Sequence, residues 1–458
     1  MTSTPPYQVT DPATGEVTEK FPFATDAEVE QALADATSAF AEWRKRPIAE
    51  RAAIVKRVAE LFTERAADLA ALITKEMGKR PAQAVGEAEF CTAIFGYYAD
   101  NGPGLLADKP LPGRTARVEY LPVGPVLGVM PWNYPYYQIA RFAAPALIIG
   151  NTVILKHAEN CPTSALAVAQ IMKDAGVPEG VYVNIFATHE QVATMIADPR
   201  LRGVSLTGSE RAGTVVAAEA GRNLKKVVLE LGGSDPYIIL DTPDVEAAAK
   251  TAWITRMENV GQACNSNKRM IVMDSVYDDF VAALVKRATG MTPREPGDDS
   301  PTAYSPMVSR KAAENLLAQV QDAVSKGATL HVGGTLTGDK GAYFAPAVLT
   351  GVTPDMRAYK EELFGPVAVV YKVSDDDEAV KLANVVDFGL GGAVWSTDEE
   401  RATRVAEQLE VGMANVNTPA GEGADLPFGG TKRSGFGREL GPLGIDEFVN
   451  KRLFYVER

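Results

Sequence analysis

Apolar residues recur at helical spacing through the N-terminal part of the chain. Thr25 and Glu28 form the pattern of a capping box, and apolar residues then return on one helical face as far as Trp43. Pro47 interrupts this pattern. Beyond it, apolar residues on one face from position 54 to position 73 predict a second, longer helix.

The spacing changes after about residue 118, where short runs of β-branched residues begin. Helices are predicted between several of these runs, for example at 164–175 and 210–220. Strands that alternate with helices over short connections indicate a parallel sheet with right-handed crossovers. The strands are expected at 126–129, 152–156, 182–186, 203–206, 226–229 and 237–240.

A glycine-rich turn at 232–236 precedes a second alternating block, from 247 to about 417. Two α/β blocks, each with its own sheet, are the simplest architecture for this pattern. The Gly- and Pro-rich stretches 100–112 and 428–437 are expected to be loops or arms. In the second block, strands are expected at 270–273, 367–373 and 392–396.

Composition and charge narrow the class of protein. Of the 458 residues, 46% are hydrophobic and 23% charged, which argues against a disordered chain. The formal net charge is −13, so neither a nucleic acid nor a membrane is expected as a partner, because phosphate-rich surfaces attract basic proteins. The N-terminal stretch lacks the pattern of a signal peptide, and no apolar run is long enough to span a bilayer. A cytoplasmic location is therefore expected.

Three cysteines and three histidines are scattered along the chain. This excludes a disulfide framework, argues against a His-based catalytic triad, and predicts no metal site. By its local sequence alone, Cys264 is most simply a small buried apolar residue, as are Cys91 and Cys161.

Three other stretches make Cys264 a candidate nucleophile. Glu230 ends an apolar strand, where burial would raise its pKa toward that of a general base; the alternative is a surface carboxylate. Asn133 lies in the stiff loop Met-Pro-Trp-Asn-Tyr-Pro, where its amide could stabilise an oxyanion, although asparagine is also common in turns. A strand leads into Gly208-Ser209 and a helix, an arrangement that can bind phosphate at the helix N-terminus.

Taken in order, these stretches resemble the aldehyde dehydrogenase superfamily. Glu230 lies in Leu-Glu-Leu-Gly-Gly and Cys264 in Gly-Gln-Ala-Cys. The resemblance continues through Leu155-Lys156, Glu-Glu-Leu-Phe-Gly-Pro at 361–366 and Pro-Phe-Gly-Gly at 427–430. It covers essentially the whole chain, and the ordered set of motifs is far more specific than any one of them.

The resemblance implies an α/β fold in three parts. These are a Rossmann-like NAD(P)-binding domain, an α/β catalytic domain and a small β arm for oligomerisation, so a homodimer or homotetramer is expected. The expected boundaries are 1–103 with 122–230 for the NAD(P)-binding domain, 231–425 for the catalytic domain, and 104–121 with 426–458 for the arm and C-terminal segment. The arm itself would combine 104–121 with 450–458.

The resemblance also implies roles for individual residues. Cys264 would attack the aldehyde, Asn133 and the backbone N–H of Cys264 would hold the oxyanion, and Glu230 would activate water to hydrolyse the thioester. The residues expected to bind the cofactor are Trp132, Lys156, Glu159, Gly208, Ser209, Glu362 and Phe364.

Glu159 bears on the choice of cofactor. Its carboxylate would repel a 2′-phosphate, which favours NAD over NADP. Lys156 could instead hold that phosphate, and a further alternative for Glu159 is an exposed carboxylate at the start of a helix.

Arg141 bears on the substrate. An arginine eight residues after Asn133 resembles the succinic-semialdehyde dehydrogenase branch, where it binds the substrate carboxylate. The alternative for Arg141 is a structural ion pair with an acidic residue. Glu258 stands where some members have a second arginine, with Arg256 nearby, which leaves a two-arginine clamp in doubt.

The favoured function is therefore NAD(P)-dependent, non-acylating oxidation of succinic semialdehyde to succinate. One alternative is a dehydrogenase of broad specificity for neutral or aromatic aldehydes. Another is an ester hydrolase that uses Cys264 and Glu230 without a cofactor.

Overall fold

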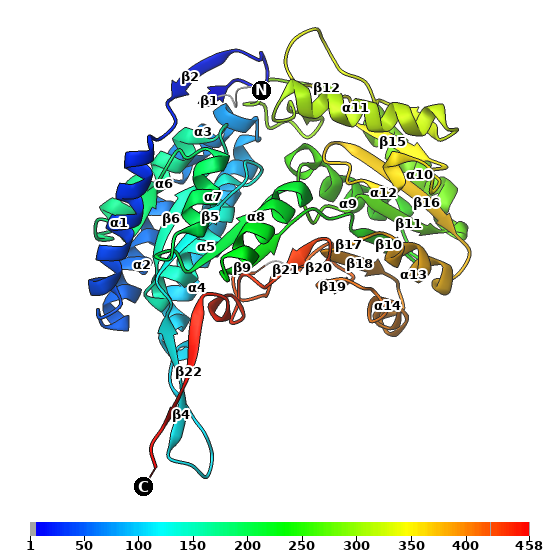
Figure 1. Cartoon of the computed structure of the whole chain (residues 1–458). Coiled ribbons are helices and arrows are strands. Elements are labelled where there is room, and N and C mark those ends of the chain that lie inside the picture. The colour runs from blue at the N-terminus through cyan, green and yellow to red at the C-terminus, as the bar shows by residue number, and fades with distance from the viewer. Residues whose placement is uncertain (1–5, 422, 458) are drawn as a thin grey trace.

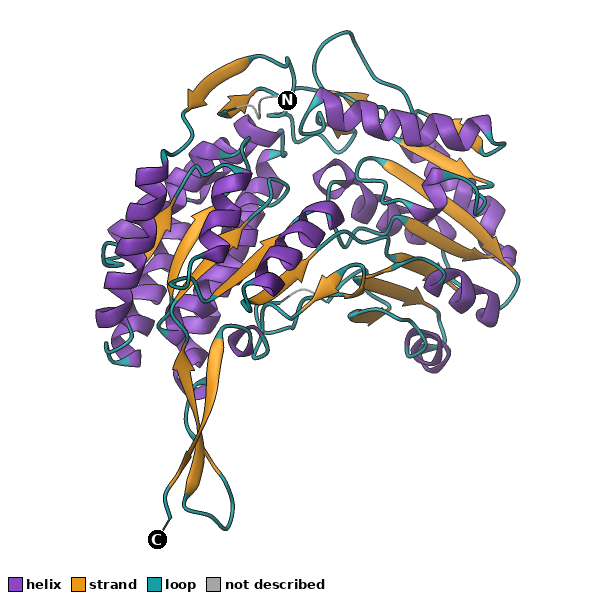
Figure 2. Cartoon of the chain, in the orientation of Figure 1, coloured by secondary structure: helices purple, strands orange, loops and turns teal. Residues whose placement is uncertain are grey.

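Two sheets, each flanked by helices, organise residues 6–421 and 423–457, which the computed structural model describes (Figures 1 and 2). A slender β arm projects away from both of them (Figure 1). The fold is therefore the expected α/β arrangement with a small arm. Residues 1–5, 422 and 458 belong to the expected domain ranges but lie outside the described residues.

The first sheet has the order β21-β9-β8-β5-β6-β7 within the described ranges. All its neighbouring strands are parallel except β21, which is antiparallel to β9. The strands predicted here are confirmed, each to within two residues at either end. The bounds are β5 (Pro125–Val129), β6 (Thr152–Lys156), β7 (Tyr182–Asn184), β8 (Gly203–Thr207), β9 (Lys226–Glu230) and β21 (Gly435–Phe436).

Helices pack around this sheet, and the first of them were predicted only in part. The N-terminal capping box is confirmed at Thr25, which caps the first helix. The expected longer helix is in fact two helices, because Arg65 leaves the helical conformation at φ −109° and ψ 11°. The apolar face continues into the same core on both sides of Arg65, so the periodicity alone did not show the break. These helices are α1 (Asp26–Trp43), α2 (Ile48–Glu64) and α3 (Ala66–Met77).

The stretch 100–112 was expected to be irregular, but a helix occupies its first half. Helix α4 (Pro81–Leu105) continues through Gly102-Pro103-Gly104. A Cβ at Gly102 would lie 2.3 Å from Ile148 Cγ2, so glycine here permits close contact between α4 and α5. The remaining helices of this part are α5 (Pro135–Ile149), α6 (Pro162–Asp174), α7 (His189–Ala197) and α8 (Glu210–Arg222).

The second sheet has the order β14-β15-β16-β11-β10-β18-β19 within the described ranges, and only β14 runs antiparallel to its neighbour. Its strands are β10 (Pro236–Ile239), β11 (Arg269–Met273), β14 (Thr329–Val332), β15 (Ala347–Thr350), β16 (Val367–Val373), β18 (Gly391–Trp395) and β19 (Met413–Val416). The helices around it are α9 (Val245–Met257), η1 (Glu258–Gly261), α10 (Asp274–Thr289), α11 (Arg310–Ser325), α12 (Arg357–Lys360), α13 (Asp376–Asn384) and α14 (Glu399–Ala406).

The arm pairs segments from opposite parts of the chain. Strand β22 (Val449–Tyr455) is antiparallel to β4 (Ala116–Pro122), which also pairs with β3 (Lys109–Pro110). The C-terminal segment does more than complete the arm, because β21 joins the first sheet and β20 (Thr431–Lys432) pairs with β17 (Phe388–Gly389). Short pairs elsewhere are β1 (Tyr7–Thr10) with β2 (Val17–Phe21) and β12 (Thr292–Pro293) with β13 (Ala303–Tyr304), and η2 spans Gly444–Asp446.

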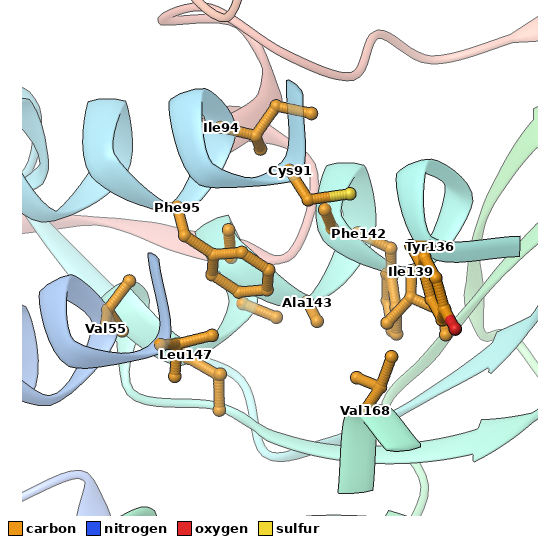
Figure 3. Packing of buried hydrophobic residues seen from close by; sticks show 14 of the residues in the cluster. Val55, Cys91, Ile94, Phe95, Tyr136, Ile139, Phe142, Ala143, Leu147 and Val168 are labelled. Atoms are coloured by element: carbon orange, nitrogen blue, oxygen red, sulfur yellow. The ribbon is translucent and has the colours of Figure 1, made fainter. Parts of the chain in front are cut away.

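The largest cluster of buried apolar side chains holds α5 in place. Figure 3 shows Cys91 and Phe95 of α4 packed with Phe142 and Leu147 of α5. Cys91 and Cys161 are both buried, as their interpretation as small apolar residues requires. Because α5 begins just after Asn133 and carries Arg141, this core fixes two of the candidate site residues. None of the helices in the described residues is long and apolar enough to cross a membrane.

Candidate active site

The turn that carries Cys264 has an unusual backbone. Cys264 is a free, partly buried cysteine between η1 and β11. Asn259, Val260 and Gly261 precede it in the left-handed region, with φ of 47°, 56° and 74°. That conformation is costly for valine. A Cβ at Gly261 would lie 2.3 Å from the carbonyl oxygen of Gly365, so the turn also requires a glycine.

Asn133 lies against this turn. Its side-chain Nδ2 donates to the backbone carbonyl oxygen of Gln262 at 3.2 Å. The backbone carbonyl oxygen of Asn133 accepts from Asn259 Nδ2 at 2.8 Å. Asn259 Nδ2 also donates to the Gln262 carbonyl oxygen at 3.2 Å. The structure thus brings the candidate oxyanion amide next to the turn of the candidate nucleophile.

The loop that carries Asn133 is anchored from α4. Glu87 Oε1 accepts from the backbone N–H groups of Tyr136 and Tyr137 at 2.8 and 3.1 Å, which satisfies the N-terminus of α5. Lys79 forms a buried ion pair with Glu87. Its Nζ also lies 3.6 Å from the centroid of the Tyr134 ring.

Glu230 is buried at the end of β9, with 1% of its surface exposed. Its two carboxylate oxygens have no hydrogen-bond partner within the described part of the chain. Burial raises the pKa of Glu230 well above its usual value, the charge of Arg141 lowers it, and the charge of Glu439 raises it further. A carboxyl group with a raised pKa can act as a general base near neutral pH.

Arg141 is fully buried, with 0% of its surface exposed. Its Nε forms an ion pair with Glu439 Oε2 at 2.8 Å, and its Nη2 donates to Thr207 Oγ1 at 3.2 Å. The guanidinium packs against the rings of both Tyr137 and Phe428, with its Cζ 4.7 and 4.4 Å from their centroids. The structural ion pair that the sequence left open for Arg141 is therefore present.

The sequence reasoning missed charged residues of this region, among them Glu439 and Lys268. Glu439 lies far from Arg141 in the chain, in a glycine-rich segment that gives no local signal of a buried carboxylate. Lys268 is buried directly before β11, and its Nζ forms an ion pair with Glu362 Oε1 at 3.0 Å. A lysine placed shortly before the apolar run 270–273 is the signal that could have identified it.

The charges around Cys264 set the state of its thiol. Burial raises the pKa of Cys264 to about 11, while the charges of Arg141 and Lys268 act to lower it and those of Glu362 and Asp235 to raise it. Burial also raises the pKa of Asp235 to about 7. In the protein without ligands, the Cys264 thiol is therefore mostly protonated at neutral pH, and a base must take its proton before it reacts.

Lys156 and Glu159 lie together at the end of β6. Their side chains form an ion pair at 2.5 Å, and His189 Nε2 lies 3.4 Å from the same Glu159 oxygen. Burial would raise the pKa of Glu159, but hydrogen bonds from His189 and Lys156 and the Lys156 charge lower it to about 2. Glu159 is therefore ionised and paired with a cation.

The other candidate cofactor residues lie in loops next to strands of both sheets. Ser209 caps α8, with its Oγ accepting from the Ala212 N–H at 3.3 Å, and Gly208 precedes it. Trp132 and Phe364 meet edge to face, with their centroids 5.7 Å apart. The residues fit a dinucleotide in kind, because they supply a helix N-terminus, a buried cation, a carboxylate and an aromatic pair.

Glycine makes room for Glu362 in this group. A Cβ at Gly232 would lie 2.4 Å from Glu362 Oε2, and the Gly233 N–H donates to Glu362 Oε1 at 3.2 Å. The glycine pair after Glu230 therefore holds the carboxylate expected to bind the nicotinamide ribose.

Arg256 does not form the second half of a clamp. Its guanidinium is buried and donates to the backbone carbonyls of Val367, Leu363 and Gly365 at 2.8, 2.7 and 2.6 Å. Glu258 accepts from Gln83 Nε2 at 2.7 Å. Arg256 thus holds the segment on either side of Phe364. Among the described residues, no group of three or more His, Cys, Asp or Glu side chains could hold a metal ion.

Comparison with known proteins gives consistent matches over the whole chain. The model of the aldehyde dehydrogenase family matches residues 1–453. A succinate-semialdehyde dehydrogenase [NADP(+)] of Deinococcus radiodurans is 52% identical, over 99% of this chain and 97% of its own. One of the same name from Mycobacterium avium is 42% identical, over 98% and 97%. The crystal structure of succinic semialdehyde dehydrogenase from Streptococcus pyogenes in complex with NADP+ superposes with a TM-score of 0.96 at 40% identity, covering 99% of this chain and all of that one.

Proposed function

This chain belongs to the aldehyde dehydrogenase family, and we propose that it oxidises succinic semialdehyde to succinate with NAD(P)+ and water. The observation that carries the proposal is the fully buried guanidinium of Arg141, whose charge acts on both Cys264 and Glu230. The names of the relatives from D. radiodurans and S. pyogenes support the same substrate.

Cys264 begins the reaction. Its proton passes to Glu230, whose raised pKa suits a base, and the thiolate adds to the aldehyde carbon. Asn133 Nδ2 and the Cys264 backbone N–H stabilise the oxyanion of the resulting thiohemiacetal. Losing one such donor typically costs about two to three orders of magnitude in rate. Bound NAD(P)+ supplies the acceptor for the hydride that leaves this carbon.

Glu230 then completes the reaction. Glu230 first releases the proton it took from Cys264 to solvent. Water then attacks the thioester on Cys264 as the Glu230 carboxylate takes a proton from that water. The bond between the acyl carbon and the sulfur breaks, so succinate leaves and the Cys264 thiolate is restored. A carboxylate without a competing partner in the described chain is suited to this step.

The substrate carboxylate is proposed to bind at Nη1 and Nη2 of the Arg141 guanidinium. Nε is occupied by Glu439. Nη1 and Nη2 contact neutral oxygens, Tyr137 Oη at 3.5 Å and Thr207 Oγ1 at 3.2 Å. A carboxylate is a stronger acceptor than either hydroxyl and can bind both Nη groups at once. Glu439 then orients Arg141 for this contact.

The substitution R141M tests the proposal. Butanal serves as the control substrate, because it has the same chain length and no carboxylate. We expect the ratio of kcat/KM for succinic semialdehyde over butanal to fall by at least about tenfold, since a hydrogen-bonded charge contributes roughly 1.5–3 kcal/mol. The double variant R141M/E439Q removes the uncompensated Glu439 charge and should show the same loss of preference. An equal fall for both substrates would limit Arg141 to the structural ion pair.

We propose that the chain accepts NADP+, as the names of its relatives indicate for them. Those names give no support to the preference for NAD that Glu159 suggested. The pairing of Glu159 with Lys156 weakens that suggestion, because a paired carboxylate repels a phosphate less than a free one.

We also propose that the β arm joins copies of this chain. Strand β22 lies at the edge of its small sheet. Leu453 and Tyr455 on this strand are 62% and 49% exposed. An exposed apolar edge strand favours pairing with another chain.

A further inference from the structure

Lys268 is a buried lysine with a full set of acceptors. None of its surface is exposed. Its Nζ donates to the carbonyl oxygens of Ala263 and Cys264 at 2.7 and 2.8 Å, and it forms the ion pair with Glu362 Oε1 at 3.0 Å. An ammonium has three protons to donate, and these three acceptors account for all of them. A lysine is rarely buried completely unless it is paired in this way.

The contacts of Lys268 join two parts of the site that differ in their proposed tasks. Ala263 and Cys264 form the turn of the nucleophile, whose backbone N–H is proposed to hold the oxyanion. Glu362 belongs to the segment proposed to hold the nicotinamide ribose and ring. The ring of Phe364, in the same segment, has its centroid 5.7 Å from Lys268 Nζ. One ammonium therefore contacts both the nucleophile turn and the cofactor carboxylate.

The two carbonyl contacts constrain the nucleophile turn. A carbonyl held at residue 264 fixes the orientation of the peptide plane that follows Cys264, and one held at residue 263 fixes the plane that contains the Cys264 N–H. Direction matters for this N–H, because an oxyanion is stabilised only by a donor that points at it. On the other side of the turn, a Cβ at Gly233 would lie 2.5 Å from the Cys264 carbonyl oxygen, so this carbonyl is confined between Lys268 and Gly233.

The ion pair constrains the cofactor carboxylate in the same way. Glu362 Oε1 receives Lys268 Nζ and the Gly233 N–H. Both contacts involve the same oxygen, so the second carboxylate oxygen remains available to accept from a ribose hydroxyl.

We propose that Lys268 is a positioning residue that couples cofactor binding at Glu362 to the geometry of the Cys264 turn. This inference rests on the proposed function, because it uses Glu362 as a cofactor ligand. Binding of the cofactor at Glu362 and placement of the Cys264 N–H then depend on the same ammonium, and loss of that ammonium disturbs both.

A double-mutant cycle on the dissociation constant of NADP+ tests the coupling. The four proteins are the wild type, K268M, E362Q and K268M/E362Q, and binding is followed by titration of tryptophan fluorescence. We expect each single variant to bind NADP+ about tenfold more weakly, and the double variant to be within about twofold of either, because the two residues act as one unit. Additive losses in the double variant, or unchanged binding by K268M, would overturn the proposal.

A second measurement does not depend on cofactor binding. It is the rate at which iodoacetamide alkylates Cys264 in protein without cofactor. Lys268 acts to lower the pKa of the Cys264 thiol, so K268M should react at least about threefold more slowly near pH 8. K268R retains the charge and should restore both the alkylation rate and NADP+ binding to within about threefold. Failure of K268R to restore either, although it folds, would contradict a role for the ammonium.

A matched control separates this role from general destabilisation. Lys225 Nζ also donates to two backbone carbonyls, those of Asp198 and Leu201 at 2.9 and 2.7 Å. K225M should leave both NADP+ binding and Cys264 alkylation within about twofold of the wild type. If the wild type oxidises succinic semialdehyde but the cycle is additive, only the coupling fails. If the wild type binds neither NADP+ nor NAD+, the proposed function and the coupling fail together.

Discussion

At the scale of single residues, reactivity at Cys264 depends on a balance between burial and charge. Burial disfavours the thiolate, whereas Arg141 and Lys268 favour it. Motifs in the sequence identified Cys264, Glu230 and Asn133 as candidates, because each lies in a short characteristic stretch. Of the charges that act on them, that of Glu439 comes from a contact that no local pattern specifies, whereas Lys268 has a local signal in its position before an apolar run.

The raised pKa of Cys264 predicts how alkylation responds to pH. Only the thiolate reacts with iodoacetamide, and below the pKa its fraction rises about tenfold per pH unit. With a pKa of about 11 in protein without cofactor, we expect the rate constant to keep rising from pH 7 to pH 10. R141M should slow the reaction at each pH, because a positive charge is lost. A plateau below pH 8 would contradict this description, and C264S gives the background rate.

Glu159 gives a second prediction at this scale, on the choice of cofactor. We expect E159S to raise the ratio of kcat/KM for NADP+ over NAD+ by about tenfold, since removing one carboxylate beside a phosphate is worth roughly 1 kcal/mol or more. The substitution also frees Lys156 from its ion pair. Steady-state rates with the two cofactors measure the ratio. If it is unchanged, Glu159 does not act on the 2′ position.

At the scale of elements, the accuracy of the sequence prediction follows the kind of signal each segment carries. Buried parallel strands such as β6 and β16 are continuous apolar runs, and their predicted bounds are those of the structure. The helix break at Arg65 contains neither glycine nor proline. Helix α4, in contrast, contains both glycine and proline near its end. It continues through them because Gly102 allows contact with α5. Tertiary packing therefore decided the course of α4.

The start of α5 gives a prediction about stability. Glu87 satisfies two N–H groups of α5 and pairs with buried Lys79. We expect E87A to lower the free energy of unfolding by about 3 kcal/mol, because it leaves a buried ammonium without its partner. K79M/E87M removes both charges and should lose less than E87A. Thermal unfolding at one scan rate compares the variants; equal stability of E87A and the wild type would rule out this anchor.

At the scale of the whole molecule, the α/β fold with a small arm was predicted from the sequence, and the ranges expected for its parts stay predictions. The boundary expected at 103 falls inside α4, which ends at Leu105. The segment 426–458 was assigned to the arm and C-terminus, yet β21 within it extends the first sheet beside Glu230. A two-residue strand such as β21 has too few residues for a periodic signal, so its partner is known only from the structure.

The proposed role of the arm leads to a prediction about the oligomeric state. We expect L453E/Y455E to shift the chain to a smaller species in size-exclusion chromatography with light scattering, because two charges on an exposed apolar strand oppose its burial against another copy. V17E changes an exposed apolar residue on β2, away from the arm, and serves as the control. An unchanged molar mass for the arm variant would show that copies do not associate through β22.

Initial rates of the wild type with succinic semialdehyde and with butanal, each with NADP+ and with NAD+, test the central claim most directly. We predict that the cofactor is reduced with both aldehydes, and that kcat/KM is at least about tenfold higher for succinic semialdehyde than for butanal. This is the preference expected from one charged hydrogen-bonding contact. Equal values for the two aldehydes would contradict recognition of a substrate carboxylate at Arg141 and leave an aldehyde dehydrogenase of broad specificity.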